Sequence, residues 1–221
     1  MTQVLDGIEV VVFDVLGTLV DEPGGLAAQI AAATGSEDAD LLAADWQRFV
    51  GQQQERIARG ERPYAPSSQI DAEAAAAAGS AELATATRRL PAWDDSAAEV
   101  SRLAERVTVL GLSNADAATL EALGRHAHLR WHRAVSAERV SAYKPDAAVY
   151  RAAIDDAGVP PERILMVAAH AWDLRGAQQA GMRTTYVPRP GGDAPASEDR
   201  FDASFGTLAE LVDAVIAGTR H

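Results

Sequence analysis

The sequence contains no cysteine, which excludes disulfide bonds, thiolate nucleophiles and thiolate metal sites. It also lacks any run of about 18 apolar residues without a charge, and its first residues lack a signal-peptide pattern. Basic residues are in the minority, with 20 lysines and arginines against 32 aspartates and glutamates. That excess of negative charge repels nucleic acid and anionic membranes, so we expect neither as a partner. We expect a soluble, cytoplasmic protein, and a small anionic substrate would need a local positive group.

Apolar, strand-like runs alternate with helix-like segments from Val100 to the end of the chain. This alternation is typical of an α/β fold, in which a Rossmann-like parallel sheet core is flanked by helices. Between residues 21 and 90 the sequence is rich in alanine and glutamine and has no strand-like run, which predicts a helical cap inserted after the first strand. We therefore expect a core domain of residues 1–20 and 91–221 and a cap domain of residues 21–90. Within the cap, the prolines and serines of Pro63–Gln69 predict a loop.

Polar side chains follow four of the predicted strands. Ligands bind at the carboxyl ends of parallel strands, so these side chains are the candidates for a site. Each one alone is explained by ordinary turn or capping chemistry. Their order along the chain is more informative: Asp-x-x-Gly-Thr, Ser-Asn, Lys-Pro-Asp and a final aspartate. The residues are Asp14 with Thr18, Ser113 with Asn114, Lys144, and Asp173.

That order resembles the haloacid dehalogenase superfamily and, within it, the L-2-haloacid dehalogenases, also called type II. The stretch "FDVLGTL" is similar to their first-strand motif, "YKPDAAVY" reproduces their Lys-Pro-Asp with a tyrosine six residues after the lysine, and "HAWD" resembles their Asn-Ala-Trp-Asp. The resemblance implies a hydrolase that displaces halide from a small 2-haloalkanoic acid through an aspartyl-ester intermediate and gives a 2-hydroxyacid. It implies (S)-2-haloacid dehalogenase activity with no cofactor and no metal, and it allows a homodimer.

The resemblance also implies roles for individual residues. Asp14 is the nucleophile. Thr18, Ser113 and Lys144 orient it and hold the substrate carboxylate, with Lys144 as the local positive charge. Backbone N–H groups at the helix starts after Ser113 and Ala171 would add to that charge.

The remaining implied roles concern the walls of the pocket. Asn114 and Trp172 line a halide pocket. Asp173 positions the water that hydrolyses the ester, and Tyr150 lies near the substrate carboxylate.

Two positions favour carbon–halogen chemistry over phosphate chemistry. The phosphatases of the superfamily have an acid two residues beyond the nucleophile and a metal-binding aspartate at the fourth strand; here these positions are Leu16 and Ala169. Phosphoryl transfer needs a cation and an acid for a poor leaving group, whereas halide leaves without a proton. Leu16 also replaces the tyrosine that the dehalogenases have on this strand.

Two further positions depart from the dehalogenase pattern. Gln47 stands where the family's cap arginine contacts the carboxylate and the departing halide, and Arg48 is turned about 100° away on a helix. Ala168 and His170 replace the family's Ser-x-Asn. Two interpretations of His170 stay open: a loop histidine with one backbone hydrogen bond, or a general base that acts on water.

Two other functions are consistent with the same scaffold. One is a hydrolase of another small anion, such as a phosphate ester, which metal dependence would reveal. The other is a non-catalytic binding protein, although the retention of Asp14, Lys144 and Asp173 together argues against it. The cluster of His126, His128 and His132 lies in an arginine-rich stretch and is predicted to be solvated surface and not a metal site.

Overall fold

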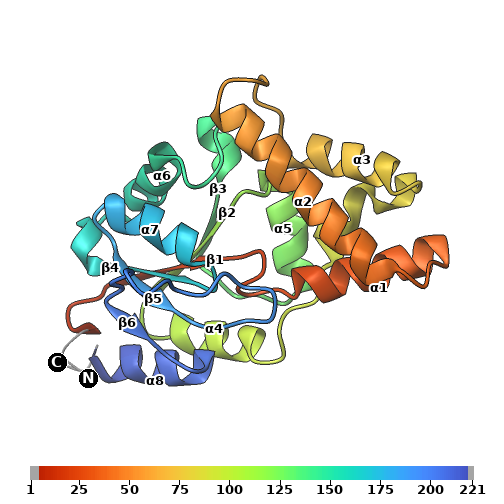
Figure 1. Ribbon diagram of the computed structural model, residues 1–221. Helices are drawn as coiled ribbons and strands as arrows, with labels where there is room; N and C mark the ends of the chain where they lie inside the picture. Colours follow the sequence, from red (N-terminus) through yellow and green to blue (C-terminus); the bar gives the residue numbers. More distant parts are fainter. Residues whose placement is uncertain (1–4, 219–221) are drawn as a thin grey trace.

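The computed structural model describes residues 5–218, and its centre is a parallel sheet of six strands in the order β3-β2-β1-β4-β5-β6 (Figure 1). Every neighbouring pair in this sheet is parallel. All residues of β1 are buried because the sheet is covered on both faces. The predicted α/β fold is confirmed. The strands are β1 (Val10–Asp14), β2 (Thr108–Ser113), β3 (Arg133–Ser136), β4 (Ile164–Ala168), β5 (Arg183–Tyr186) and β6 (Ala203–Ser204).

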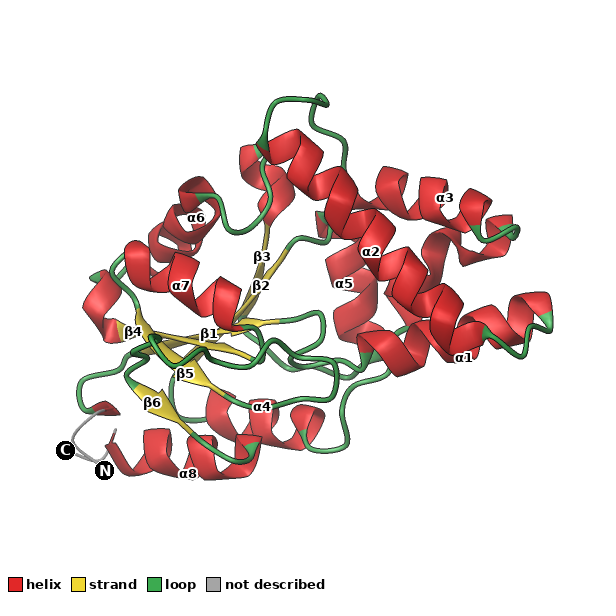
Figure 2. Cartoon of the chain, in the orientation of Figure 1, coloured by secondary structure: helices red, strands yellow, loops and turns green. Residues whose placement is uncertain are grey.

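Helices form one layer on each face of the sheet, as the colours of Figure 2 make visible. Successive side chains of a strand point to opposite faces, so β1 contributes to two separate cores. Val11 and Phe13 belong to one core, and Val10 and Val12 belong to the other. The first core packs against α4 (Ser96–Ala104), α5 (Ala117–His126) and α8 (Leu208–Gly218), and the second against α6 (Ala147–Ala157) and α7 (Ala171–Gln179).

The segment between β1 and α4 is helical and contains no strand within its described residues 21–90. We call residues 22–89 the helical segment. It comprises α1 (Glu22–Thr34), α2 (Ala39–Ala58), α3 (Ser67–Ala77) and the 3-10 segment η2 (Ala81–Arg89). Helices after the first strand were predicted; their division from the sheet as a separate domain stays a prediction.

The loop predicted over Pro63–Gln69 is too long, because α3 already begins at Ser67. The cause is a carboxylate distant in sequence. Asp116 accepts hydrogen bonds from the Ser68 backbone N–H at 2.8 Å and from the Ser67 hydroxyl at 3.1 Å. An acceptor at a helix start satisfies donors that have no partner inside the helix. Because Asp116 comes from the start of α5, local sequence gave no sign of it.

The chain leaves the sheet for the helical segment and returns to it at adjacent positions. The Asp21 N–H donates to the Pro91 carbonyl at 2.9 Å, and the Trp93 N–H donates to the Leu19 carbonyl at 3.1 Å. Arg189 contacts both the departing and the returning segment. Its Nε donates to the Thr18 carbonyl at 3.0 Å, and its guanidinium lies 5.8 Å from the Trp93 ring centroid. The two crossings form one short ladder.

Three histidines that the sequence placed at the surface lie there. His126, His128 and His132 are exposed, and the described residues contain no group of acidic or histidine side chains that would hold a metal ion. Residues 5–218 also contain no helix that is both long enough and apolar enough to cross a bilayer.

Candidate functional site

Asp14 ends the central strand, and the turn after it supplies the first partner of its carboxylate. Gly17 has a φ of +79°, a left-handed conformation that glycine adopts without strain, and it reverses the chain after β1. Thr18 is thereby returned to Asp14, and its hydroxyl donates to Oδ2 at 2.7 Å. The same hydroxyl accepts the Ala169 N–H from the end of β4 at 2.9 Å. The turn therefore fixes Asp14 across two adjacent strands.

Lys144 joins two aspartates below the surface of the site. Its Nζ donates to Asp14 Oδ1 at 2.7 Å and to Asp173 Oδ2 at 2.6 Å, and the side chains of Lys144 and Asp173 are 1% and 0% exposed. Burial alone would lower the pKa of Lys144, but the two adjacent carboxylates outweigh burial and raise the pKa. The lysine is therefore held as a cation at this edge of the sheet, as predicted.

Tyr150 contacts Asp173 and is not among the residues that line the cavity, so its implied position near a substrate carboxylate stays a prediction. The tyrosine is fully buried on α6, and its hydroxyl donates to Asp173 Oδ1 at 2.7 Å. Burial, together with Asp173, raises the pKa of Tyr150, so its hydroxyl keeps its proton. Tyr150 and Lys144 thus hold one oxygen each of Asp173, and Tyr150 is a positioning residue.

Replacing Gly176 with alanine is expected to disturb this chain of contacts. A Cβ at Gly176, on α7, would lie 2.4 Å from the Tyr150 hydroxyl oxygen. Overpacking of this kind costs about 1–3 kcal/mol, more than the gain in helix propensity of up to about 1 kcal/mol. Urea unfolding of Gly176→Ala should therefore show a net loss of stability. Gly51→Ala, on α2 with nothing within 4 Å of the new Cβ, should instead gain stability; an equal effect at both positions would contradict this account of Tyr150.

A cavity of about 200 Å³ opens above Asp14 and Lys144. One wall comes from the ends of the strands and the start of α7, and the other comes from α1 and α2 of the helical segment. The strand-side residues are Asp14, Leu16, Ser113, Asn114, Lys144, His170 and Trp172, and the helical-segment residues are Glu22, Gln47, Val50, Gly51 and Gln54. The structure thus brings together in one cavity all the predicted site residues except Thr18, Tyr150 and Asp173, which lie behind it.

His170 lies flat between the turn of Asp14 and the cavity. Its ring stacks on Trp172 with centroids 5.8 Å apart, and its Nε2 approaches so closely that a Cβ on Gly17 would be 2.6 Å away. The backbone carbonyl of His170 accepts the Asp173 N–H at 3.1 Å, but the two side chains share no hydrogen bond. His170 therefore lines the cavity without a side-chain hydrogen bond to Asp173.

The helix starts beside the site offer less positive charge than predicted. The N–H groups of Ala171 and Trp172, which open α7, donate to Asp193 at 2.9 and 3.1 Å. Ahead of α5, which begins at Ala117, the N–H of Ala115 donates to the Ser113 hydroxyl at 3.1 Å. These donors are occupied by the protein itself, so they are not free to bind an anion.

Asn114 connects the lysine loop with the helical segment. Its Oδ1 accepts the Lys144 backbone N–H at 2.8 Å, and its Nδ2 donates to Gln54 Oε1 at 3.0 Å. Gln54 is one of two cavity residues whose importance the sequence analysis missed. The signal was present, because Gln47, Val50 and Gln54 are spaced to share one face of a helix.

Glu22 is the second missed residue and the only carboxylate that the described part of the helical segment places in the cavity wall. In the sequence it resembles an ordinary acidic residue of a helix first turn, and it does begin α1. Gln47 of α2 lines the same cavity, and its side chain acts to lower the pKa of Glu22. Burial, with a smaller contribution from the carboxylates of Asp71 and Asp14, raises the pKa of Glu22 to about 7.

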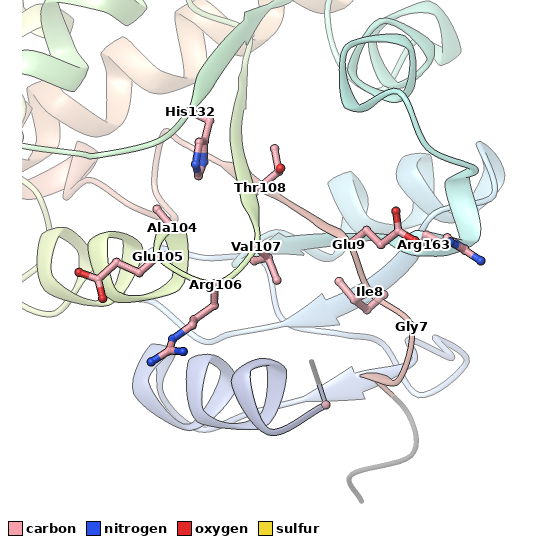
Figure 3. A pocket seen from close by; sticks show the side chains of 11 residues that line it. Gly7, Ile8, Glu9, Ala104, Glu105, Arg106, Val107, Thr108, His132 and Arg163 are labelled. Carbon is pink, nitrogen blue, oxygen red and sulfur yellow. Dashed lines mark hydrogen bonds and ion pairs between the residues drawn. The ribbon is translucent and has the colours of Figure 1, made fainter. Parts of the chain in front are cut away.

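A larger hollow of about 640 Å³ lies at the opposite, amino-terminal edge of the sheet (Figure 3). It is lined by Glu9, Arg106, His132 and Arg163 among others, and Glu9 and Arg163 pair with each other there. Ligands of open parallel sheets bind at the carboxyl ends of the strands. The smaller cavity above Asp14 is therefore the candidate active site.

Comparisons with known proteins agree with this geometry. Residues 8–181 match the haloacid dehalogenase-like hydrolase family. The (S)-2-haloacid dehalogenase 4A of Burkholderia cepacia is 30% identical over 132 residues, which are 58% of this chain and 57% of that enzyme. An (S)-2-haloacid dehalogenase of Pseudomonas sp. (strain YL) is 34% identical over 99 residues, covering 44% and 42% of the two chains. The matches thus span about half the length of these curated relatives.

Solved structures extend the similarity over nearly the whole chain. A crystal structure of an L-2-haloacid dehalogenase is 27% identical with a TM-score of 0.85, covering 95% of this chain and 99% of that one. The L-2-haloacid dehalogenase of Xanthobacter autotrophicus with chloropropionic acid covalently bound is 24% identical with a TM-score of 0.81 over 94% and 98%, and shares the fold. The family match covers most of the chain and includes the strands that end at Asp14 and Ser113 and the helix α7 that carries Asp173. The chain therefore belongs to the haloacid dehalogenase-like hydrolases.

Proposed function

We propose that this protein is a hydrolase of the 2-haloacid dehalogenase type, acting on small (S)-2-haloalkanoic acids. The observation that carries the proposal is Asp14 in the cavity wall, its oxygens held by Thr18 and Lys144 at 2.7 Å each, with Leu16 where a phosphatase has its acid. A bare carboxylate oriented in this way is a nucleophile for carbon. The relatives named as dehalogenases support the same choice.

The first step forms an ester. An oxygen of Asp14 attacks C2 of the haloacid, the carbon–halogen bond breaks with inversion, and halide leaves with the bonding electrons. Lys144, fixed by Asp173, orients Asp14 and supplies the one lysine or arginine among the described cavity-lining residues. Asn114 and Trp172 border the space into which halide departs.

The second step restores the enzyme. Water attacks the aspartyl carbonyl carbon of the ester, the product leaves as a 2-hydroxyacid, and one proton is released. His170 lines the cavity and is the base that takes this proton. Asp173 acts from behind Lys144, because it is completely buried and lies outside the cavity lining.

Halide release from a panel of short 2-haloacids tests the proposal most directly. A general phosphatase substrate, assayed in parallel with and without Mg²⁺, tests the phosphatase alternative. We expect halide and 2-hydroxyacid from the haloacids and no phosphate. Phosphate release without halide release would mean that the protein is a phosphatase. Binding of a haloacid or a phosphate ester without turnover would mean that the protein is non-catalytic.

Excess chelator is expected to leave the rate of halide release unchanged. The mechanism uses no metal step, because Leu16 and Ala169 replace the carboxylates that phosphoryl transfer would need beside Asp14. The measurement is halide release before and after dialysis against EDTA, with and without added Mg²⁺. A rate lost on dialysis and restored by Mg²⁺ would contradict the dehalogenase mechanism.

Three further expectations belong to this proposal. The protein acts in the cytoplasm, it forms a homodimer, and residues 21–90 are a cap domain that closes over the core. Sedimentation of the purified protein measures its oligomeric state. Limited proteolysis at the Asp21 and Pro91 crossings tests whether residues 21–90 form a separate domain.

A further inference from the structure

The cavity has more negative than positive side chains. Asp14 and Glu22 line it, Asp173 lies directly behind it, and Lys144 is the single lysine or arginine among the described lining residues. That lysine is already shared between Asp14 and Asp173 at 2.7 and 2.6 Å. A haloacid carries its own carboxylate, so its entry adds another negative charge to this cavity.

The wall formed by α1 and α2 supplies further side chains that can contact the substrate carboxylate. Glu22 and Gln47 both line this wall, and Gln47 stands where the dehalogenases that the sequence resembles have an arginine. The Ala115 N–H ahead of α5 and the Ala171 and Trp172 N–H groups at the start of α7 already have acceptors within the protein. An ionised Glu22 beside a substrate carboxylate would leave two like charges together in a half-buried site, which is unfavourable.

We propose that Glu22 is a specificity-determining residue that binds the substrate carboxylate as a neutral carboxylic acid, so that a haloacid enters the cavity together with one proton. The inference rests on the proposed function. The hydroxyl of the protonated Glu22 donates to a substrate oxygen, and the Gln47 amide donates beside it. A charge-assisted hydrogen bond of this kind replaces the ion pair that an arginine would make.

The surroundings of Glu22 make this protonation accessible near neutral pH. Burial raises the pKa of Glu22 to about 7. The charged and titratable groups that face it are Asp14 of β1, Asp71 of α3, Lys144 before α6 and His170 at the start of α7. Asp71 is itself buried with a pKa raised to about 6 and is fixed by the Thr87 hydroxyl at 2.9 Å.

The test compares an acid with its neutral amide. We expect kcat/KM for (S)-2-chloropropionate to fall about tenfold per pH unit above pH 7, because Glu22 loses its proton. For 2-chloropropionamide, which brings no charge, we expect a flat profile over the same range. Both assays use wild-type protein and measure chloride.

Two variants test whether Glu22 is the group that carries the proton taken up with the substrate. Glu22→Gln is close in shape and always neutral, and it should flatten the acid's profile and raise kcat/KM for the acid at pH 8.5 by at least about tenfold over wild type. Glu37→Gln, an exposed position outside the cavity, is the matched control and should keep the wild-type profile. An unchanged slope in Glu22→Gln would assign the proton to another group and overturn the proposal.

Calorimetry supplies a readout independent of turnover. Propionate binding at pH 8, measured in buffers of different ionisation enthalpy, should take up about one proton in wild type and none in Glu22→Gln. A flat acid profile, or an equal decline for acid and amide, overturns the role of Glu22 but leaves the dehalogenase function standing. No chloride from either compound overturns the proposed function and this inference together.

Discussion

A single turnover in ¹⁸O-water, with enzyme in excess, is expected to give unlabelled 2-hydroxyacid and to place the heavy oxygen in the peptide that contains Asp14. The reason is geometric: Asp14 lies in the cavity wall with its oxygens fixed by Thr18 and Lys144 at 2.7 Å each. An oxygen of this carboxylate becomes the product hydroxyl, and water enters only at the aspartyl carbonyl. Mass spectrometry measures the ¹⁸O content of the product and of the peptide that contains Asp14.

The control is the same incubation without substrate, which should leave the peptide unlabelled. Asp14→Asn is less informative, because it abolishes activity whether Asp14 attacks carbon or only deprotonates a water. Product that carries the label in the first turnover would instead mean that a water, activated by Asp14 or His170, attacks C2 directly. That result would remove the aspartyl ester from the mechanism.

Lys144→Met is expected to abolish halide release and to lower the free energy of unfolding at pH 8 by about 3–5 kcal/mol, the usual cost of removing one partner of a buried ion pair. The substitution would leave the carboxylates of Asp14 and Asp173 facing each other without their shared cation. Urea denaturation measures the loss. Arg163→Met removes a cation from an exposed pair with Glu9 and should change stability little.

The stability lost in Lys144→Met should return in part as pH falls. Burial raises the pKa of Asp173 even beside the lysine, and without the lysine this pKa rises further. The folded variant then binds a proton more tightly than the unfolded chain does. Its stability is therefore lowest above the folded-state pKa and recovers as pH decreases toward the ordinary carboxylate range. A deficit that is constant from pH 8 to pH 5 would contradict the account of this buried pair.

The sheet was predictable because its signals are local. The burial of β1, β2 and β4 on both faces appears in the sequence as uninterrupted apolar runs, and the helices between them show helical spacing. The two-residue strand β6 and the start of α3 were missed for physical reasons. β6 is too short to show a pattern, and α3 begins where Asp116, distant in sequence, accepts the Ser68 N–H and the Ser67 hydroxyl.

The site was predictable mainly on the strand side, and on the helical side only Gln47 was predicted. Asp14, Ser113, Lys144 and His170 follow strands, and the fold brings strand ends together regardless of detail. Glu22 gave no signal, because its importance depends on how α1 packs over the cavity and on its contact with Gln47. The contact of Tyr150 with Asp173 gave no signal for a similar reason: only the tertiary structure turns its hydroxyl toward Asp173.

The short ladder between Leu19–Asp21 and Pro91–Trp93 bears on how this protein and its relatives diverge. Because departure and return lie side by side and are fastened by Arg189, the length and shape of the intervening helices are decoupled from the position of β1. Insertions, deletions or exchanges of those helices can accumulate over generations while Asp14 stays in place. Related proteins can thus keep the same nucleophile while the helices that form the opposite wall of the cavity differ.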